Sequence, residues 1–148
     1  MTLSSLITNL ELSKRLKELG VPQKSYFRWC LVSEVDPTTA EPESKKEWKL
    51  DRRDGGLGMH VFYEEVSAFL SGELGEILPA WIEYKYQFVS WKVAEPFGGG
   101  WCVSYREPGK TDDFVPMIHG KNEADARGEM VAWLIKNHLL EIPGEKNV

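Results

Sequence analysis

The chain has 148 residues, of which 42% are hydrophobic and 28% are charged, and this composition is typical of one soluble globular domain. Its formal net charge of −5 argues against a nucleic-acid-binding protein, because binding to phosphates needs clustered Lys and Arg. No apolar run approaches the ~20 residues of a membrane-spanning helix, and no signal peptide is visible. We therefore expect a cytoplasmic protein without membrane contact.

Neither the cysteines nor the histidines have the spacing of a metal site. Cys30 and Cys102 form no CxxC pattern, and the three histidines are far apart in the sequence. We therefore expect no metal and no cofactor. Both cysteines fall in expected strands, where a free thiol behaves as a small buried apolar side chain. A cysteine paired with a histidine as nucleophile and base is an alternative that no local pattern supports.

The first expected element is a helix over residues 9–20. Asn9 has a side chain suited to an N-cap, and Gly20 followed by Pro22 is a typical helix end. Between them, leucines repeat at the spacing of one helix face: Leu12, Leu16 and Leu19. The pattern predicts an amphipathic helix whose leucines are buried.

Alternation of apolar and polar residues predicts the strands. They span residues 25–33, 47–53, 59–65, 81–93 and 101–107, and Pro116 makes 114–119 at most an edge strand. The Asp-Gly-Gly turn at 54–56 favours a hairpin between the second and third strands, and 94–100 is a second hairpin connection. In the longest strand the apolar residues change face near the end, which indicates a bulge.

Two further helices are expected, one short and one long. The short helix covers residues 72–78, with Ser71 as its cap and Pro79 after its end. The long helix begins at Asn122. Its buried side is expected to consist of Ala126, Met130, Trp133 and Leu134. Gly128 within this helix would mark close packing against the sheet.

Together these elements predict an α+β fold in a single domain over residues 1–148. Strands joined by short connections pair antiparallel, so we expect a single antiparallel sheet of four to six strands. Two longer helices and one short helix would pack with this sheet. Residues 1–8 and 143–148 are expected to be loose termini.

Five residues are the candidates for binding a ligand or a partner: Trp81, Trp91, Phe97, Gly99 and Trp101. Trp81 and Trp91 would lie on the sheet face opposite to Tyr84 and Phe88, and an exposed aromatic surface marks an interface or a ligand site. The glycines at 98–100 lead into a strand rather than a helix, so they form a hairpin tip and not a phosphate loop. The alternative is that these aromatic side chains fill the core.

No set of residues has the pattern of a catalytic site, so no catalytic residue is assigned. Glu64, Glu65, Glu73 and Glu76 are close in the sequence, and paired carboxylates can transfer protons. Solvated glutamates beside a short helix are the more common arrangement of such residues.

Three blocks of the chain, 9–30, 66–79 and 122–140, resemble a group of small uncharacterised proteins encoded by bacteriophages and prophages. In that group a helix of the form LELSKRLKELGV, here Leu10–Val21, precedes a strand with an aromatic-x-Trp pattern, here within Tyr26–Trp29. An ELGEILP segment at Glu73–Pro79 and an EADAR segment at Glu123–Arg127 complete the likeness. The resemblance implies a phage or mobile-element origin and the cytoplasm of a bacterial host, but it assigns no functional residue.

We therefore expect a non-enzymatic accessory protein that binds a host protein or sequesters a small ligand, with antagonism of a host defence system as one such role. Two alternatives stay open. One is a small hydrolase acting on a nucleotide-like substrate through the region of Glu64, Glu65 and Glu73. The other is a structural or assembly protein that forms a homo-oligomer through an exposed sheet. Nucleic acid and membranes are not expected as partners.

Overall fold

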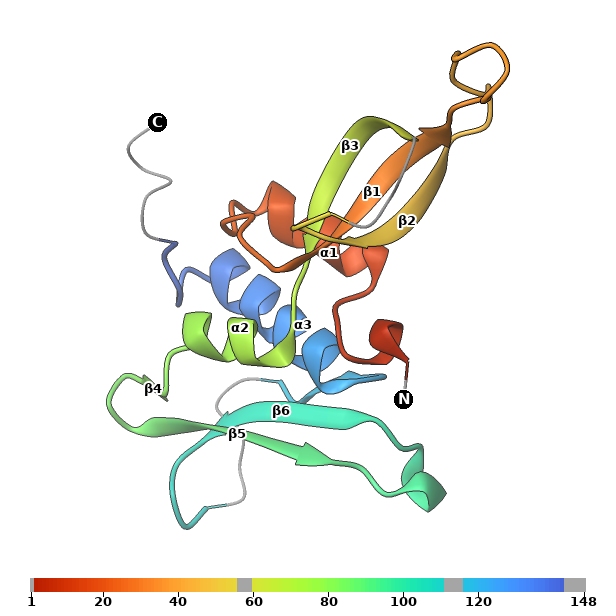
Figure 1. Ribbon diagram of the computed structural model, residues 1–148. Coiled ribbons are helices and arrows are strands. Elements are labelled where there is room, and N and C mark those ends of the chain that lie inside the picture. Colours follow the sequence, from red (N-terminus) through yellow and green to blue (C-terminus); the bar gives the residue numbers. More distant parts are fainter. Residues whose placement is uncertain (1, 56–59, 111–115, 143–148) are drawn as a thin grey trace.

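The computed structural model describes residues 2–55, 60–110 and 116–142 (Figure 1). Within these ranges the chain forms three α-helices and two antiparallel sheets, and the helices lie between the sheets (Figure 1). The predicted α+β class is therefore confirmed. The prediction of a single sheet is wrong, because the strands divide into one sheet of three and one of four.

The elements are, in chain order, η1 (Leu3–Ser5), α1 (Leu10–Glu18), β1 (Phe27–Glu34), β2 (Glu47–Arg52), β3 (His60–Ala68), α2 (Ser71–Ile77), β4 (Trp81–Ile82), β5 (Tyr86–Lys92), η2 (Glu95–Phe97), β6 (Trp101–Arg106), β7 (Ile118–Gly120) and α3 (Glu123–Lys136). The sheets have the orders β2-β1-β3 and β4-β5-β6-β7. Of the helices in the described ranges, none combines the length and the apolar composition that crossing a bilayer requires.

The caps of the two longer helices are those that the sequence predicts. The side chain of Asn9 accepts a hydrogen bond from the Leu12 N–H at 2.9 Å, and Asn122 accepts one from the Asp125 N–H at 2.7 Å. The short helix α2 differs from its prediction, since Leu70 is its N-cap and Ser71 is its first helical residue. The Leu70 side chain makes no capping hydrogen bond, and the Leu70 backbone N–H donates to the Glu73 carboxylate at 2.8 Å.

The three-stranded sheet has β1 in its centre, and the predicted hairpin between β2 and β3 is wrong. Both strands pair antiparallel with β1: Arg52, the last residue of β2, lies opposite Phe27, and His60, the first of β3, lies opposite Glu34. The end of β2 and the start of β3 therefore lie at opposite ends of β1, and the two strands run parallel to each other. A turn sequence marks where a chain bends but does not choose which edge the next strand joins. Gly56 of the predicted turn lies outside the described residues.

The strand predicted over residues 81–93 is in fact the β4–β5 hairpin. Glu83, Tyr84 and Lys85 connect the paired residues Ile82 and Tyr86. Glu83 and Tyr84 have φ values of 53° and 58°, and the Lys85 N–H donates to the Ile82 carbonyl at 3.1 Å. Such turns usually contain Asn and Gly, so neither residue gave a signal in the sequence. Tyr84 is 99% exposed, which corrects its predicted place on an apolar face with Phe88.

The hydrophobic core surrounds α3, which contacts α1, α2, β6 and β7. Its buried side chains include Leu12, Leu16, Val103, Tyr105, Ala126, Met130 and Leu134. The predicted stripes of α1 and α3 are confirmed at these positions, whereas Leu19 and Trp133 are only half-buried. Gly128 packs against α1 and not against a sheet, because a Cβ atom there would lie 2.8 Å from Leu12 Cδ2.

The segment before α1 is fixed at its end. Ile7 and Thr8 are fully buried, and the Thr8 N–H donates to the Phe69 carbonyl at 2.9 Å. The Thr8 carbonyl accepts a hydrogen bond from Trp29 Nε1 at 3.1 Å. The loose lead-in expected over residues 1–8 is therefore wrong for its last two residues. The expected loose terminus at 143–148 lies outside the described residues.

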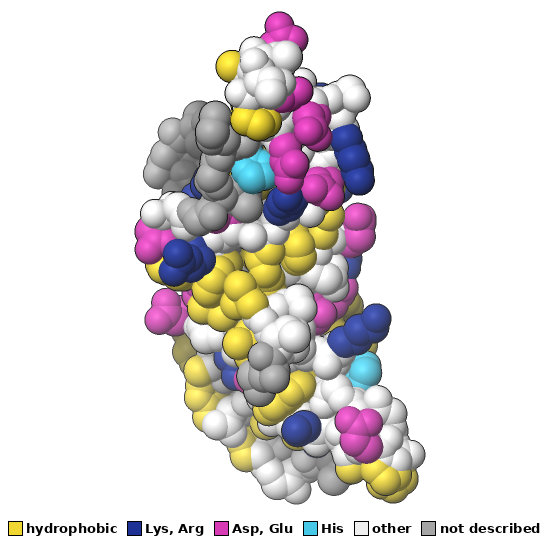
Figure 2. Space-filling model, turned by 45° about the vertical axis from the view of Figure 1, so that its right-hand side comes forward, with side chains coloured by type: hydrophobic (Ala, Val, Ile, Leu, Met, Phe, Trp, Pro, Cys, Tyr) yellow, Lys and Arg dark blue, Asp and Glu magenta, His cyan; other side chains and the backbone are white. Residues whose placement is uncertain are grey.

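One face of the molecule carries hydrophobic side chains across its middle, with acidic and basic side chains gathered above them (Figure 2). This is the side on which β2 lies in Figure 1, turned forward. Part of the hydrophobic side-chain area of the chain is therefore exposed at the surface and not buried in the core.

Candidate functional site

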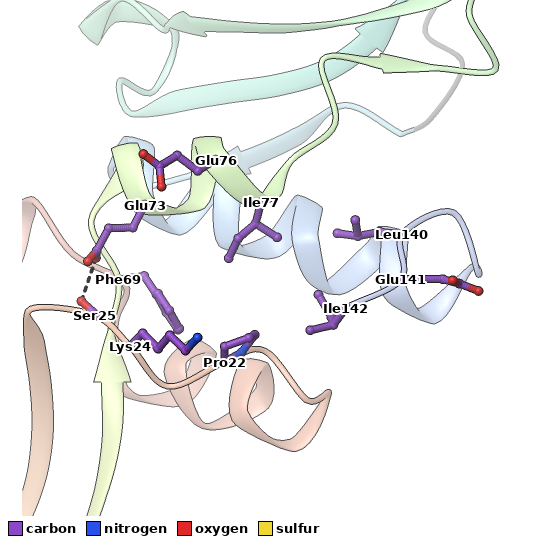
Figure 3. A pocket seen from close by; sticks show the side chains of 10 residues that line it. All are labelled: Pro22, Lys24, Ser25, Phe69, Glu73, Glu76, Ile77, Leu140, Glu141 and Ile142. Carbon is purple, nitrogen blue, oxygen red and sulfur yellow. Dashed lines mark hydrogen bonds between the residues drawn. The ribbon is translucent and has the colours of Figure 1, made fainter. Parts of the chain in front are cut away.

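A cleft of about 500 Å³ opens at the surface between α2, the segment after α1 and the segment after α3 (Figure 3). Its lining consists of Pro22, Lys24, Ser25, Phe69, Glu73, Glu76, Ile77, Leu140, Glu141 and Ile142. The volume lies within the range of about 300–1,000 Å³ that is usual for small-molecule sites.

The cleft has an apolar floor that three separate segments build. Phe69 comes from the link between β3 and α2, Ile77 from the end of α2, and Leu140 and Ile142 from the segment after α3. In Figure 3 the side chains of Ile77, Leu140 and Ile142 point toward a shared space. Phe69 is 3% exposed and belongs to the core, so it forms the rigid base of the cleft.

One wall of the cleft is fixed by hydrogen bonds to Glu73. Its carboxylate accepts from Ser25 Oγ at 2.7 Å, the contact drawn as a dashed line in Figure 3. It also accepts from the backbone N–H groups of Leu70 at 2.8 Å and Tyr26 at 3.2 Å. Glu73 therefore joins the start of α2 to the start of β1 and serves as a structural acceptor.

The rim of the cleft carries more negative than positive charge. Among the described residues that line it, Lys24 is the one cationic side chain, against the carboxylates of Glu73, Glu76 and Glu141. The side chains of Lys24 and Glu76 make no ion pair or hydrogen bond with any residue that the structure describes. This balance disfavours a ligand with several negative charges, because like charges repel most strongly where water is partly excluded.

The glutamates of the hydrolase alternative are not brought together. Glu64 and Glu65 are adjacent in β3, so their side chains point to opposite faces of the sheet. Glu65 forms ion pairs with Arg28 and Arg53, whereas the Glu73 carboxylate is held at the start of α2. Across the described ranges, no three side chains of His, Cys, Asp or Glu lie close enough together to hold a metal ion.

The two cysteines lie in different sheets, Cys30 in β1 and Cys102 in β6, and both are free and buried. Burial raises the pKa of the Cys30 thiol and of the Cys102 thiol. A raised pKa keeps a thiol protonated at neutral pH, and the thiolate is the reactive form. Neither cysteine is therefore set up as a nucleophile.

Two of the five aromatic and glycine candidates, Trp81 and Trp91, share a face of the four-stranded sheet. Trp81 lies opposite Gln87, and Trp91 is four residues further along β5, so both point to the same side. Phe88 on the other side contacts Tyr105, which places the helices there. Trp81 is 46% exposed, whereas Trp91 is half-buried beneath the Arg106 guanidinium, 4.6 Å from its ring centre.

The other three candidates lie elsewhere. Trp101 is the first residue of β6, lies on the sheet face that carries Phe88 and Tyr105, and packs against the hydrophobic core. Phe97 is 83% exposed in η2, at the tip of the β5–β6 connection. Gly99 is buried with a φ of 67°, and its carbonyl oxygen is 2.8 Å from His119 Nε2. The five residues therefore do not form one surface.

Sequence reasoning missed the cleft because its lining comes from segments far apart in the chain. The one signal was the presence of apolar residues beyond the end of the last helix, at Leu140 and Ile142, where a solvated tail would be polar.

Comparison with known proteins adds no assignment. No protein-family model matches the chain, and no match is found among curated proteins or among solved structures. A functional assignment therefore depends on the geometry of the described residues.

Proposed function

We propose that this chain is a non-enzymatic binding protein that holds a small, largely apolar ligand in the cleft beside α2. The observation that carries the proposal is the apolar floor formed by Phe69, Ile77 and Ile142 in a cleft of about 500 Å³. Binding sites for small molecules are concave and mostly apolar, with a few polar groups that set orientation. Lys24, Glu76 and Ser25 supply such groups at the rim.

The charge of the rim narrows the class of ligand. One ammonium group against three carboxylates, counted over the described lining residues, favours an uncharged or cationic molecule over a nucleotide or another polyanion. The same balance disfavours the alternative of a hydrolase that acts on a nucleotide-like substrate. Binding is also favoured over covalent catalysis because both thiols are buried and have a raised pKa.

The biological part of the proposal rests on the resemblance to phage and prophage proteins. A small protein of that origin that sequesters a host molecule in the bacterial cytoplasm would act as an antagonist of a host process, with a defence system as the proposed target. A small protein suits sequestration, since stoichiometric binding needs no catalytic apparatus.

The first test is native mass spectrometry of the protein purified from bacterial cells, followed by titration with Nile red, an uncharged apolar dye. We expect a retained small molecule, or dye binding that Ile77→Glu abolishes by placing a carboxylate on the apolar floor. Met117→Glu is the matched control, because Met117 is 54% exposed and does not line the cleft. Equal dye binding by both variants, with no retained molecule, would contradict the proposal.

A protein partner is the second candidate function, and the β4–β5 hairpin favours it. The left-handed backbone at Glu83 and Tyr84 costs about 1–2 kcal/mol for each residue, yet the Tyr84 side chain makes almost no contact within the chain. Trp81 beside it is 46% exposed, so the hairpin presents two large aromatic side chains. Loss of a co-purified protein in Tyr84→Ala, with Phe97→Ala unaffected, would support this function.

A further inference from the structure

We infer that the free edge of β2 is a docking site for a second copy of this chain, which pairs with it antiparallel about a two-fold axis at Leu50. This contact is independent of the ligand proposed for the cleft. Among the described residues, β2 is hydrogen-bonded to β1 alone. An edge strand presents a row of unpaired backbone N–H and C=O groups that another strand can join.

The geometry of β2 suits such pairing better than that of the other edge of the same sheet. All six residues of β2, Glu47–Arg52, are in register with β1 without a shift, and none is a proline. The opposite edge, β3, has a register shift beside Leu31 and Val32, and it lies against α1. A bulge and a covering helix are features that block edge pairing, and β2 has neither.

An apolar strip continues to the β2 edge on one face of the sheet. Trp48 lies opposite Leu31, and Leu50 lies opposite Trp29, so these four side chains share that face. All four are only half-buried, and none belongs to the main hydrophobic core. The hydrophobic area in Figure 2 lies on the side of the molecule that carries β2. A second copy would continue the strip across the axis, where the Leu50 side chains of the two copies meet.

Symmetry restricts how two β2 strands can pair. In an antiparallel pair, directly opposed residues point to the same face of the sheet. A two-fold axis perpendicular to the sheet also keeps each side chain on its own face, so the axis must pass between the two copies of a single residue. With the axis at Leu50, Lys49 lies opposite Asp51 of the second copy, and Glu47 lies opposite its Arg53. Trp48 then faces Arg52 of the second copy. Lys49 thus meets an opposite charge and Arg52 meets an aromatic ring, whereas the Arg53 guanidinium is held toward β3, at the opposite edge of the sheet, by Ser67 and Glu65.

The neighbouring registers bring like charges together. An axis at Lys49 places the two Lys49 side chains opposite each other and sets Glu47 against Asp51. An axis at Asp51 pairs two aspartates. An axis at Trp48 overlaps only Glu47–Lys49 of the strand. The charge pattern of β2 therefore opposes the registers centred on Lys49 and Asp51, and the register centred on Trp48 is short, which leaves the one centred on Leu50 as the long register.

The proposed contact also completes an existing ion-pair network. Asp51 is nearly buried and already accepts from Arg28 at 2.9 Å. Lys49, with a side chain 30% exposed, now pairs with Glu34 at 3.4 Å and Glu47 at 3.3 Å. In the dimer its ammonium would reach Asp51 of the second copy and give that carboxylate a second cation.

The test combines the mass of the assembly with a cross-link that reports the register. Sedimentation of the full chain should show a dimer, and Leu50→Glu should remove it by placing two carboxylates on the axis. Phe62→Glu on β3 is the matched control and should stay dimeric, because Phe62 is exposed on the other edge. Thermal melting of each variant checks that it is folded.

Under mild oxidation, Leu50→Cys should form a disulfide-linked dimer, because directly opposed residues have Cβ atoms about 4.5–5.5 Å apart. Lys49→Cys should not, and wild type should stay uncross-linked because Cys30 and Cys102 are buried. A monomer at every soluble concentration overturns the inference. A dimer that Leu50→Glu leaves intact, or that Lys49→Cys cross-links in place of Leu50→Cys, overturns it as well.

Discussion

Asp125 in the first turn of α3 accepts two hydrogen bonds from Asn9, the N-cap of α1: one from its backbone N–H at 2.8 Å and one from its side-chain amide at 3.0 Å. The structure shows that its carboxylate turns to the neighbouring helix, so one anion lies at the N-termini of both. Helix N-termini carry partial positive charge, so the arrangement stabilises both helices.

Replacement of Asp125 by Ala should destabilise the protein by about 1–3 kcal/mol, because the Asn9 N–H loses its acceptor at a site that is 7% exposed. Urea denaturation measures the change. Glu11→Ala is the control: Glu11 is also acidic and in a first helical turn, but its side chain is 84% exposed. Its effect should stay within about 0.5 kcal/mol. Equal effects of the two variants would show that the link between the helices adds no stability.

Gly128→Ala should destabilise the protein, although Ala normally favours a helix by about 1 kcal/mol. The new Cβ atom would lie 2.8 Å from Leu12 Cδ2 and 3.1 Å from Thr8 Cγ2, and both residues are fully buried. We expect a loss of about 1–3 kcal/mol in unfolding free energy. Gly72→Ala in α2 is the comparison, because nothing lies within 4 Å of its Cβ position. A gain in stability from both substitutions would mean that α1 can move away from α3 without cost.

Trp101→Ala should lower the free energy of unfolding by about 1–3 kcal/mol, since it removes a half-buried ring that packs against the core. Phe97→Ala, at the exposed tip of the same connection, should leave stability unchanged. Thermal and urea melts of the two variants separate a core role from a surface role. Normal melting of Trp101→Ala together with loss of ligand or partner binding would instead restore Trp101 as a binding residue.

The buried thiols should make stability fall in alkali. Burial raises the pKa of Cys30 and Cys102 in the folded state. When the pH rises above the ordinary thiol pKa of ~8.5, the unfolded chain therefore loses these protons while the folded protein still keeps them. The unfolded state is then favoured as pH rises. Above that pH, the urea concentration at the midpoint of unfolding should fall more steeply with pH in the wild type than in the double variant Cys30→Ala/Cys102→Ala. Ellman's reagent should react with the thiols only after denaturation, and rapid reaction of the folded protein would contradict this expectation.

Local features were the part of the fold that could be predicted from the sequence. The caps at Asn9 and Asn122, and the buried positions Leu16 and Met130, depend on residues within two helical turns of one another. The two-sheet arrangement depends on which strand joins which edge, and a turn sequence does not encode that choice. The β4–β5 turn uses Glu83 and Tyr84 in a conformation usually left to Gly and Asn, so composition pointed to a continuous strand.

The candidate site was less predictable than the fold. Aromatic residues stand out in a sequence, yet Trp101 packs on the core and Trp91 lies under Arg106. The cleft joins Pro22, Phe69 and Ile142, which are separated by most of the chain. Such a site is a product of tertiary packing, and no periodicity within one segment indicates it.

The central position of α3 has a consequence for how the protein is made. This helix touches α1, α2 and the strands β6 and β7, yet at Glu123–Lys136 it follows all of them in the sequence. During synthesis the leucines of α1 and the sheet therefore stay uncovered until α3 has left the ribosome. Folding of the whole unit waits for α3, and chains that still lack it display apolar surface on which chaperones act.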